Sequence, residues 1–276
     1  MLWKVESTGG SVRGCQLLDE LYIAFANGVS ADATKISCKT ATRFIAKNRS
    51  TMPAATIIDS LDFIDGPTFK ISDGPGAAYI FHEIFLRDQY PKRLLRAAHT
   101  IVDVGSNIGL FSYYARLHAP HARILAFEAD PTTFAIMDEN LADQDIARFH
   151  RAVASQSGTI DFYSSPTSGW SSLYPVLGAA NARRVVVKAE PLSQALHGID
   201  KIDFLKIDVE GAEYDILLGD KALWDIPIRN LVVEVDRAPR DPRYTISALL
   251  DLLRKKFQSV SIGSGDYPLI IARNAS

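Results

Sequence analysis

Hydrophobic and polar residues alternate in a regular order from about residue 100 onward. Short apolar runs that suit buried strands are separated by segments in which apolar residues recur every three or four positions, as on one face of a helix. Five main strands are expected, at 100–104, 122–127, 148–154, 204–209 and 231–235. Because helical segments connect strands in this region, the pattern predicts βαβ units and an α/β fold with a doubly wound, mostly parallel sheet.

The end of the chain departs from this alternation. Residues 259–262 and 269–272 are apolar runs on either side of a glycine-containing turn, so they predict an antiparallel pair at one edge of the sheet. Residues 158–163 and 184–189 predict two further β segments, which flank a stretch rich in serine and glycine.

The first part of the chain is less regular. The turn cluster Ser72-Asp73-Gly74-Pro75-Gly76 marks a boundary between residues 1–75, an N-terminal extension or small subdomain, and a main domain at 76–276. A chain of 276 residues with 47% hydrophobic residues is long enough for one α/β domain with such an extension.

Composition and charge narrow the classes of partner. The formal net charge of -2 lacks the basic excess typical of proteins that follow a phosphate backbone, so we expect no nucleic-acid partner. No apolar run approaches the roughly 20 residues of a membrane helix, and the N-terminus does not resemble a secretory signal. Cys15 and Cys38 form no paired motif and are expected to be reduced thiols, which favours the cytoplasm.

The loop after the first main strand has the features of a nucleoside site. Gly105 and Gly109 allow a tight turn, and the amides that open the next helix face the ligand. Dinucleotide-binding loops carry a glycine where the pyrophosphate presses on the backbone, and here that position is Asn107. Asp103 would repel phosphate and attract an ammonium group. The loop therefore favours a small nucleoside ligand over NAD, although a glycine turn without a ligand also fits.

Glu128 strengthens this interpretation. It ends the second strand about 25 residues after Asp103, near the position from which an acidic residue binds ribose hydroxyls in dinucleotide folds. The alternative is a solvent-facing glutamate ahead of a helix that Asp130 and Pro131 open.

Charged residues in the fourth strand give the second candidate site. Strand alternation places Lys206, Asp208 and Glu210 on one side, where burial is costly unless the charges are paired or used. An internal salt bridge between Lys206 and Asp208 remains the structural alternative. Glu234 and Asp236 emerge in the same way from the fifth strand.

Together these motifs resemble the FkbM family of methyltransferases over roughly residues 77–236. The matching segments are Asp103–Gly109, Glu128–Pro131 with Phe134 and Asn140, and above all Lys206-Ile-Asp-Val-Glu-Gly-Ala-Glu213; Phe81–Ile84 with Tyr90 and the serine-rich tract 168–173 also match. The resemblance implies a class I methyltransferase fold, S-adenosylmethionine as cofactor, and O-methylation of hydroxyls on sugars, glycoconjugates or secondary metabolites. One departure is Ser193 after Leu192, where the family often has aspartate, and a structural cap is lost there.

These observations assign a role to each candidate residue. Asp208 is the first candidate for the general base or substrate orienter, Lys206 could stabilise a developing alkoxide, and Glu210 is a further catalytic candidate. His150 is a second choice for the base. The residues expected to bind the cofactor are Asp103, Gly105, Ser106, Asn107, Gly109, Glu128, Ala129, Ala152, Val153 and Asp208. The residues expected to bind the acceptor, a small molecule or glycan, are Trp170, Ser171, Ser172 and Glu234.

Three alternatives stay open beside this reaction. Asp208, Glu210, Glu234 and Asp236 could bind a magnesium ion that acidifies the acceptor, although metal-free transfer is favoured. The chain could instead be a catalytically silent module that binds adenosylmethionine, or an NAD-dependent oxidoreductase. The oligomeric state does not follow from the sequence.

Overall fold

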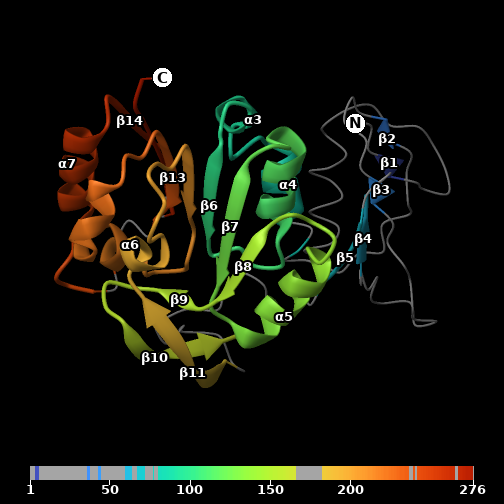
Figure 1. The fold of residues 1–276 in the computed structure, drawn as a ribbon, viewed down its shortest axis with the longest axis horizontal. Coiled ribbons are helices and arrows are strands. Elements are labelled where there is room, and N and C mark those ends of the chain that lie inside the picture. The colour runs from blue at the N-terminus through green and yellow to red at the C-terminus, as the bar shows by residue number, and fades with distance from the viewer. Residues whose placement is uncertain are drawn as a thin grey trace. The chain divides into compact units, whose positions relative to one another are not determined.

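A computed structural model shows the fold (Figure 1). It describes residues 4–5, 36–37, 43–44, 60–63, 67–71, 77, 80–165, 182–235, 239, 241–264 and 267–275. The chain divides into two compact units, Met1–Gln89 and Tyr90–Ser276, and each is described by itself. In the described ranges, no helix has the length and apolar character needed to cross a membrane.

The second unit is built on a seven-stranded sheet in the order β14-β15-β13-β12-β6-β7-β8. The strands are β6 (Thr100–Val104), β7 (Arg123–Glu128), β8 (Ala147–His150), β12 (Phe204–Ile207), β13 (Asn230–Glu234), β14 (Ser259–Ile262) and β15 (Leu269–Arg273). Neighbouring strands are parallel except that β15 runs antiparallel to both β13 and β14. This confirms the doubly wound, mostly parallel sheet with an antiparallel pair at one edge, as expected for the class I methyltransferase fold.

Strand order also fixes where a ligand would bind. Strand β6 lies between β7 and β12, so the chain builds the sheet outward in two directions from β6. In such sheets, ligands bind beyond the carboxyl ends of the strands at this reversal. The loops that follow β6, β7, β12 and β13 therefore surround the expected site.

Helices cover both faces of the sheet (Figure 1). On one face, apolar residues of β6, β12 and β13 form a core with α6 (Leu192–Ala195), the π-helix η2 (Asp215–Gly219), the 3-10 helix η3 (Lys221–Asp225) and α7 (Ile246–Lys256). On the other face, Phe111 of α4 (Leu110–His118) stacks on Phe204 of β12 with ring centroids 5.8 Å apart. Helix α3 (Lys92–Leu95) precedes β6.

Helix α5 (Pro131–Asn140) begins as its sequence predicts. The carboxylate of Asp130 accepts the Thr132 and Thr133 amides at 2.8 and 3.1 Å, and Pro131 takes the first helical position, where no amide is needed. The cap fixes the path of the chain directly after β7, and thereby the surroundings of Glu128.

The expectation of one continuous strand at 148–154 is wrong. Strand β8 ends at His150, and β9 (Ala152–Val153) pairs with β11 (Arg183–Glu190) in a separate three-stranded sheet with β10 (Gly158–Ser164). Between β8 and β9, the backbone amide of Arg151 donates to the carbonyls of Glu128 and Phe149. The guanidinium of Arg151 pairs with Glu190. These contacts turn the chain out of the main sheet.

The first unit contains short strands and an aromatic cluster. Strands β1 (Lys4–Val5), β2 (Ile36–Ser37) and β3 (Arg43–Phe44) form one sheet, and β4 (Ser60–Asp62) pairs with β5 (Thr68–Lys70). The π-helix η1 (His82–Leu86) follows, and Phe81 stacks on Phe85 with ring centroids 4.8 Å apart. Phe63 contacts the rings of Phe69, Phe81 and Phe85, and this packing stabilises the unit locally.

Candidate active site

The β6 loop, Gly105–Gly109, requires unusual backbone conformations. Gly105, Asn107 and Gly109 have φ angles of 80°, 50° and 93°, in the left-handed region that glycine and, less readily, asparagine adopt. This explains why two glycines and an asparagine occupy these positions. The amides of Gly105 and Ser106 donate to the carbonyl of Phe127 at 3.0 and 2.9 Å, which ties the loop to β7.

Side-chain amides complete the β6 loop. The Asn107 Oδ1 atom accepts the Ile108 amide at 2.7 Å, and the Nδ2 atom of Asn140, from α5, donates to the Ile108 carbonyl at 3.0 Å. The Asn107 side chain is therefore turned back onto the backbone of its own loop. The sequence marked Asn140 only as part of a motif, and the structure shows that its side chain holds the β6 loop.

Glu128 braces the β6 loop from the end of β7. Its side chain is only 8% exposed, and its two oxygens accept the amides of Asn107 and Asp130, each at 2.8 Å. Burial raises the pKa of Glu128 to about 7, although the two amide bonds oppose the shift. Because each carboxylate oxygen has two lone pairs, the group can still accept hydrogen bonds from a ligand.

Asp103 is fully buried beneath the β6 loop. The Ser112 hydroxyl of α4 donates to its Oδ2 atom at 2.6 Å, and its Oδ1 atom lies 3.2 Å from the Lys206 ammonium. The Ser106 hydroxyl donates to the Asp103 carbonyl at 2.9 Å. The structure thus directs this carboxylate toward α4 and β12, whereas the sequence suggested a contact with a ligand ammonium.

Lys206 links β12 to the β6 loop. Its ammonium donates to the Gly105 carbonyl at 2.6 Å and lies 3.6 Å from the Asp208 carboxylate. Burial acts to lower the pKa of Lys206, but the charges of Asp103 and Asp208 outweigh it and raise the pKa above its usual value. Lys206 is therefore a charged, buried tie between strands. The salt bridge between Lys206 and Asp208, the structural alternative given by the sequence, is present. The hydrogen bond to the Gly105 carbonyl is an additional contact.

The β12 loop, Asp208–Gly211, follows the strand directly. The strand ends at Ile207, so Asp208 and Glu210 lie in this loop rather than on one continued strand. The Asp208 side chain is 33% exposed, and the Tyr90 hydroxyl donates to its Oδ2 atom at 3.4 Å. Glu210 and Gly211 have φ angles of 58° and 117°, so this loop also has left-handed residues.

The β6 and β12 loops pack directly against each other. A Cβ atom placed on Gly105 would lie 1.7 Å from the Asp208 carbonyl oxygen, a distance no side chain can occupy. Gly105 is therefore required for two reasons, its left-handed backbone and this contact with the β12 loop. Any shift of one loop must move the other.

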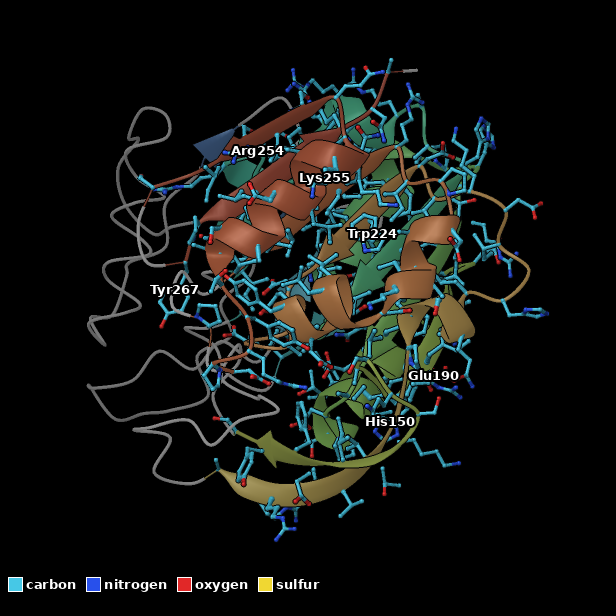
Figure 2. All side chains as sticks on the ribbon, turned by 90° about the vertical axis from the view of Figure 1, so that its left-hand side faces the viewer. His150, Glu190, Trp224, Arg254, Lys255 and Tyr267 are labelled. Carbon is cyan, nitrogen blue, oxygen red and sulfur yellow. The ribbon has the colours of Figure 1, made fainter. Side chains whose placement is uncertain are left out.

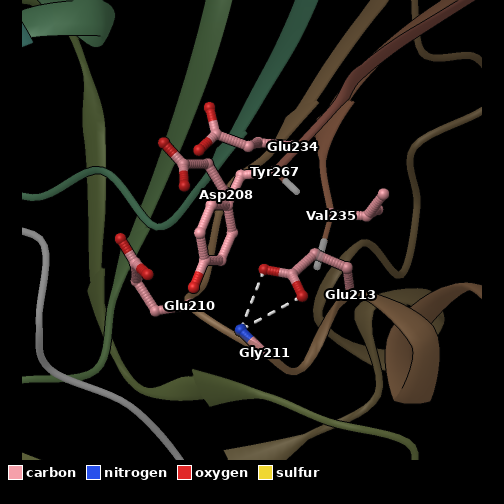
Figure 3. A pocket seen from close by; sticks show the side chains of 7 residues that line it. All are labelled: Asp208, Glu210, Gly211, Glu213, Glu234, Val235 and Tyr267. Atoms are coloured by element: carbon pink, nitrogen blue, oxygen red, sulfur yellow. Dashed lines mark hydrogen bonds between the residues drawn. The ribbon is translucent and has the colours of Figure 1, made fainter. Parts of the chain in front are cut away.

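Four acidic residues and a tyrosine line a pocket beside the β12 loop (Figure 3). The pocket is open to solvent and encloses only about 20 Å³, and its lining residues are Asp208, Glu210, Gly211, Glu213, Glu234, Val235 and Tyr267. Tyr267, just before β15, is 62% exposed (Figure 2). The structure thus brings together Asp208, Glu210 and Glu234 as the sequence suggested.

Two polar side chains of the pocket lining, Tyr267 and Glu213, escaped the sequence reasoning. Tyr267 comes from the turn between the last two strands, and no local pattern marks it. Glu213 lay inside the recognised motif, and its position at the start of a helix, two residues after a glycine, was a usable signal for a capping side chain.

Comparison with known proteins decides the family. Residues 103–258 match the methyltransferase FkbM domain, which is more than half of the chain. The chain belongs to the FkbM methyltransferase family. The match spans the β6 loop, Glu128, the β12 loop and Glu234, whereas Tyr90 and Tyr267 of the site lie outside the matched residues.

Three relatives illustrate the range of this family. The chain is 34% identical over 210 residues to the methyltransferase sdnD of Sordaria araneosa, covering 63% of this chain and 80% of that protein. It is 28% identical over 218 residues to the 31-O-demethyl-FK506 methyltransferase FkbM of Streptomyces tacrolimicus, covering 65% and 82%. It is 27% identical over 171 residues to the 2-O-methyltransferase NoeI of Sinorhizobium fredii, covering 55% and 70%.

The departure from the FkbM pattern at Ser193 is compensated within the fold. Helix α6 has no side-chain cap of its own, but the Asp220 carboxylate accepts the amide and the hydroxyl of Ser193 at 2.8 and 2.7 Å. The carboxylate of Asp220, which is distant in the sequence, thus accepts a backbone amide at the start of this helix.

Other candidate residues lie in apolar clusters, on an exposed side of β8 or outside the described residues. Ala152 packs with Phe162 in a small apolar cluster that Ala129 joins, and Val153 joins the main core. His150 stacks on Phe134 with centroids 4.9 Å apart, on the exposed side of β8 (Figure 2). Trp170, Ser171, Ser172 and Asp236 lie outside the described residues. Within the described ranges, no three His, Cys, Asp or Glu side chains are grouped to hold a metal ion.

Proposed function

We propose that this FkbM-family protein transfers a methyl group from S-adenosylmethionine to a hydroxyl of a small-molecule or glycan acceptor. The observation that carries this proposal is the contact between Gly105 and Asp208. It joins a loop suited to bind a nucleoside to a partly exposed carboxylate that lines an acidic pocket. Two relatives support oxygen as the acceptor atom, since one is named for a 31-O-demethyl substrate and the other as a 2-O-methyltransferase.

The β6 loop fits S-adenosylmethionine better than a dinucleotide. Gly105 and Gly109 allow the tight turn and pack closely on Asp208 and Leu141, while Asn107 stands where a dinucleotide-binding loop has a glycine. The free lone pairs of Glu128 suit the two ribose hydroxyls. The backbone of Ser106 and the side chain of Ala129 would flank the adenosine, whereas Ala152 and Val153, also expected there, are buried in apolar clusters. Asp103 would contribute through the loop that it supports, because its carboxylate is buried. When bound, the cofactor supplies a methyl group made electrophilic by its sulfonium.

Asp208 is suited to act as the general base. As the acceptor oxygen forms a bond to the methyl carbon and the carbon–sulfur bond breaks, the hydroxyl proton passes to the Asp208 carboxylate. Tyr90 and Lys206 both contact its Oδ2 atom, at 3.4 and 3.6 Å, and hold it at the pocket edge. Lys206 also partly offsets negative charge that develops on the acceptor oxygen.

The other pocket carboxylates would orient the acceptor. Glu210 and Glu234 line the pocket beside Asp208 and can accept hydrogen bonds from further hydroxyl groups. Tyr267 at the mouth offers an aromatic surface for an apolar or sugar face. Since four carboxylates line one pocket, an acceptor rich in neutral hydroxyls fits better than one carrying phosphate.

Two rival functions can be separated from this one. A silent binding module would have no use for a partly exposed aspartate held by a tyrosine and a lysine at a pocket edge. A magnesium ion at Asp208, Glu234 and Asp236 would acidify the acceptor in another way. Methyl transfer that survives treatment with EDTA would remove the magnesium alternative.

The first experiment tests the cofactor. Calorimetric titration with S-adenosylhomocysteine and with NAD is expected to show binding of the first compound and none of the second. Binding of NAD without binding of S-adenosylhomocysteine would reject the methyl-transfer proposal in favour of an oxidoreductase.

The second experiment tests the base. Asp208→Asn should lower kcat by roughly 10² to 10⁴-fold while the affinity for S-adenosylhomocysteine stays within about threefold. Asp161→Asn is a matched control, because Asp161 is exposed on β10 and pairs with Arg184. Unchanged turnover in Asp208→Asn would show that Asp208 is not the base.

A further inference from the structure

Glu213 is a buried carboxylate in the pocket wall with no part in the proton transfer just described. Its side chain is 2% exposed, and it stands where the chain re-enters a helix after the β12 loop. The Val209 amide donates to its Oε1 atom at 3.1 Å, and the Gly211 amide donates to both oxygens at 3.1 Å (Figure 3). The carboxylate is thus turned back onto the loop that precedes it.

The β12 loop needs such support because its conformation is strained. Glu210 has a φ angle of 58°, which costs free energy for a residue with a side chain, and Gly211 has a φ angle of 117°. The amides on either side of Glu210 are the ones that bond to Glu213. These hydrogen bonds hold Glu210 in a conformation that its own backbone disfavours.

A carboxylate suits this task better than a neutral amide. The Val209 and Gly211 amides converge on two acceptor oxygens, and hydrogen bonds to a charged acceptor are stronger than those to a neutral one. Glutamine at this position would offer one acceptor oxygen, and its NH₂ group would face an N–H donor. Charge and shape therefore both matter at position 213.

The position of the loop in turn sets the two groups that face the acceptor. Asp208 and Glu210 both belong to the loop, and the Asp208 carbonyl presses on the β6 loop where a Cβ on Gly105 would lie only 1.7 Å away. A loosened β12 loop would lose the alignment of Asp208 with the acceptor.

We propose that Glu213 is a positioning residue, whose carboxylate holds the β12 loop in the conformation that presents Asp208 and Glu210 to the acceptor. This inference rests on the proposed function, which assigns the pocket to the acceptor. Burial raises the pKa of Glu213 to about 7, a shift that the nearby Asp208 charge increases and the loop amides oppose.

Hydrogen exchange at the Val209 and Gly211 amides tests the hold on the loop directly. Exchange is compared in the wild type, Glu213→Gln, Glu213→Asp and the control Glu190→Gln, which makes the same chemical change to a carboxylate paired with Arg151. In Glu213→Gln, both amides should exchange at least about tenfold faster. Glu213→Asp, which keeps the charge with a shorter reach, should fall between it and the wild type. Glu190→Gln should leave both amides unchanged.

Turnover and cofactor binding separate positioning from general stability. Labelled S-adenosylmethionine is the donor, and the acceptor is the methyl glycoside that the wild type methylates fastest in a screened panel. Glu213→Gln should lower kcat about tenfold, with the affinity for S-adenosylhomocysteine within about threefold of wild type and partial rescue in Glu213→Asp.

Each outcome bears on one proposal. Unchanged exchange in Glu213→Gln overturns the inference, and so does faster exchange with wild-type kcat. If Glu213→Gln does not fold, wild-type exchange and kcat in Glu213→Asp overturn it instead. A wild type that binds no S-adenosylhomocysteine, or methylates none of the panel, counts against the proposed function. Exchange then decides alone whether Glu213 holds the loop.

Discussion

The β6 and β12 loops solve the same structural problem with the same kind of group. Each contains a non-glycine residue in the left-handed region, Asn107 with φ 50° and Glu210 with φ 58°. A buried glutamate supports each loop: Glu128 accepts one backbone amide of the first, and Glu213 accepts two of the second. Burial raises the pKa of each glutamate to about 7.

The two loops differ in where the glutamate comes from. Glu128 belongs to the neighbouring strand and bonds to Asn107 across 21 residues, whereas Glu213 bonds to amides two and four residues before it. The β6 loop therefore depends on correct assembly of the sheet. The β12 loop carries its own support, so its shape can be altered with less effect on the sheet.

The contact between the loops should give the largest effect on cofactor affinity. In Gly105→Ala, the new Cβ would meet the Asp208 carbonyl at 1.7 Å, so both loops must move. Affinity for S-adenosylhomocysteine should fall by more than about 100-fold, measured by calorimetry. Gly198→Ala is the matched control, since Gly198 has nearly the same φ, 81°, with nothing within 4 Å of the added atom. Equal losses in both variants would assign the effect to backbone strain alone.

Lys206 ties the loops together, and its removal should destabilise the fold. Lys206→Met would leave the buried Asp103 carboxylate without its cation, at a cost of about 3 to 5 kcal/mol in the free energy of unfolding. Denaturant unfolding measures this loss. Lys201→Met removes the ion pair of a mostly exposed lysine with Asp203 and should cost less than about 1 kcal/mol. Similar losses in the two variants would argue that the Lys206 pair is not buried in solution.

The pH dependence of the free energy of unfolding should reflect the raised pKa values of Glu128 and Glu213. The pKa of each is about 7 in the folded state against 4.5 in a free chain, so the folded state holds each proton more tightly. Their contribution is therefore complete below about pH 4.5 and is lost as the pH rises through about 7, by at most on the order of 3 kcal/mol each. Glu128→Gln and Glu213→Gln should each flatten the fall in unfolding free energy across this range. An unaltered slope in both variants would contradict the shifted pKa values.

The smallest expected effect concerns the orientation of Asp208. Tyr90→Phe removes a hydroxyl that bonds to Asp208 at 3.4 Å, so kcat should fall about three- to tenfold while cofactor affinity stays constant. Tyr244→Phe removes a comparable bond, to Asp215 at 2.9 Å, and should leave kcat near the wild-type value. A larger fall in Tyr244→Phe than in Tyr90→Phe would mean that kcat follows general stability.

The sequence predicted the sheet well because its signals are local. Apolar runs marked β6, β7, β12 and β13, and the Asp130-Pro131 pair marked the start of α5. The continuous third strand failed because Arg151 leaves the sheet through contacts with Glu128, Phe149 and Glu190, which no local pattern encodes.

The sequence predicted which residues belong to the candidate site better than it predicted what those residues contact. Asp208, Glu210 and Glu234 do line one pocket. Asp103 and Lys206 were expected near ligands, but the structure pairs them with each other inside the fold. Such pairing depends on which strands become neighbours, and only the strand order reveals it.

A crossed comparison of Glu128→Gln and Glu213→Gln tests most directly whether the two loops have separate tasks. The affinity for S-adenosylhomocysteine and kcat for methyl transfer are measured in both variants. Glu128→Gln should weaken binding by about tenfold or more, because the loop amide of Asn107 loses a charged acceptor, while Glu213→Gln should lower kcat with binding nearly unchanged. Loss of the same parameter in both variants would contradict this division between a cofactor loop and an acceptor loop.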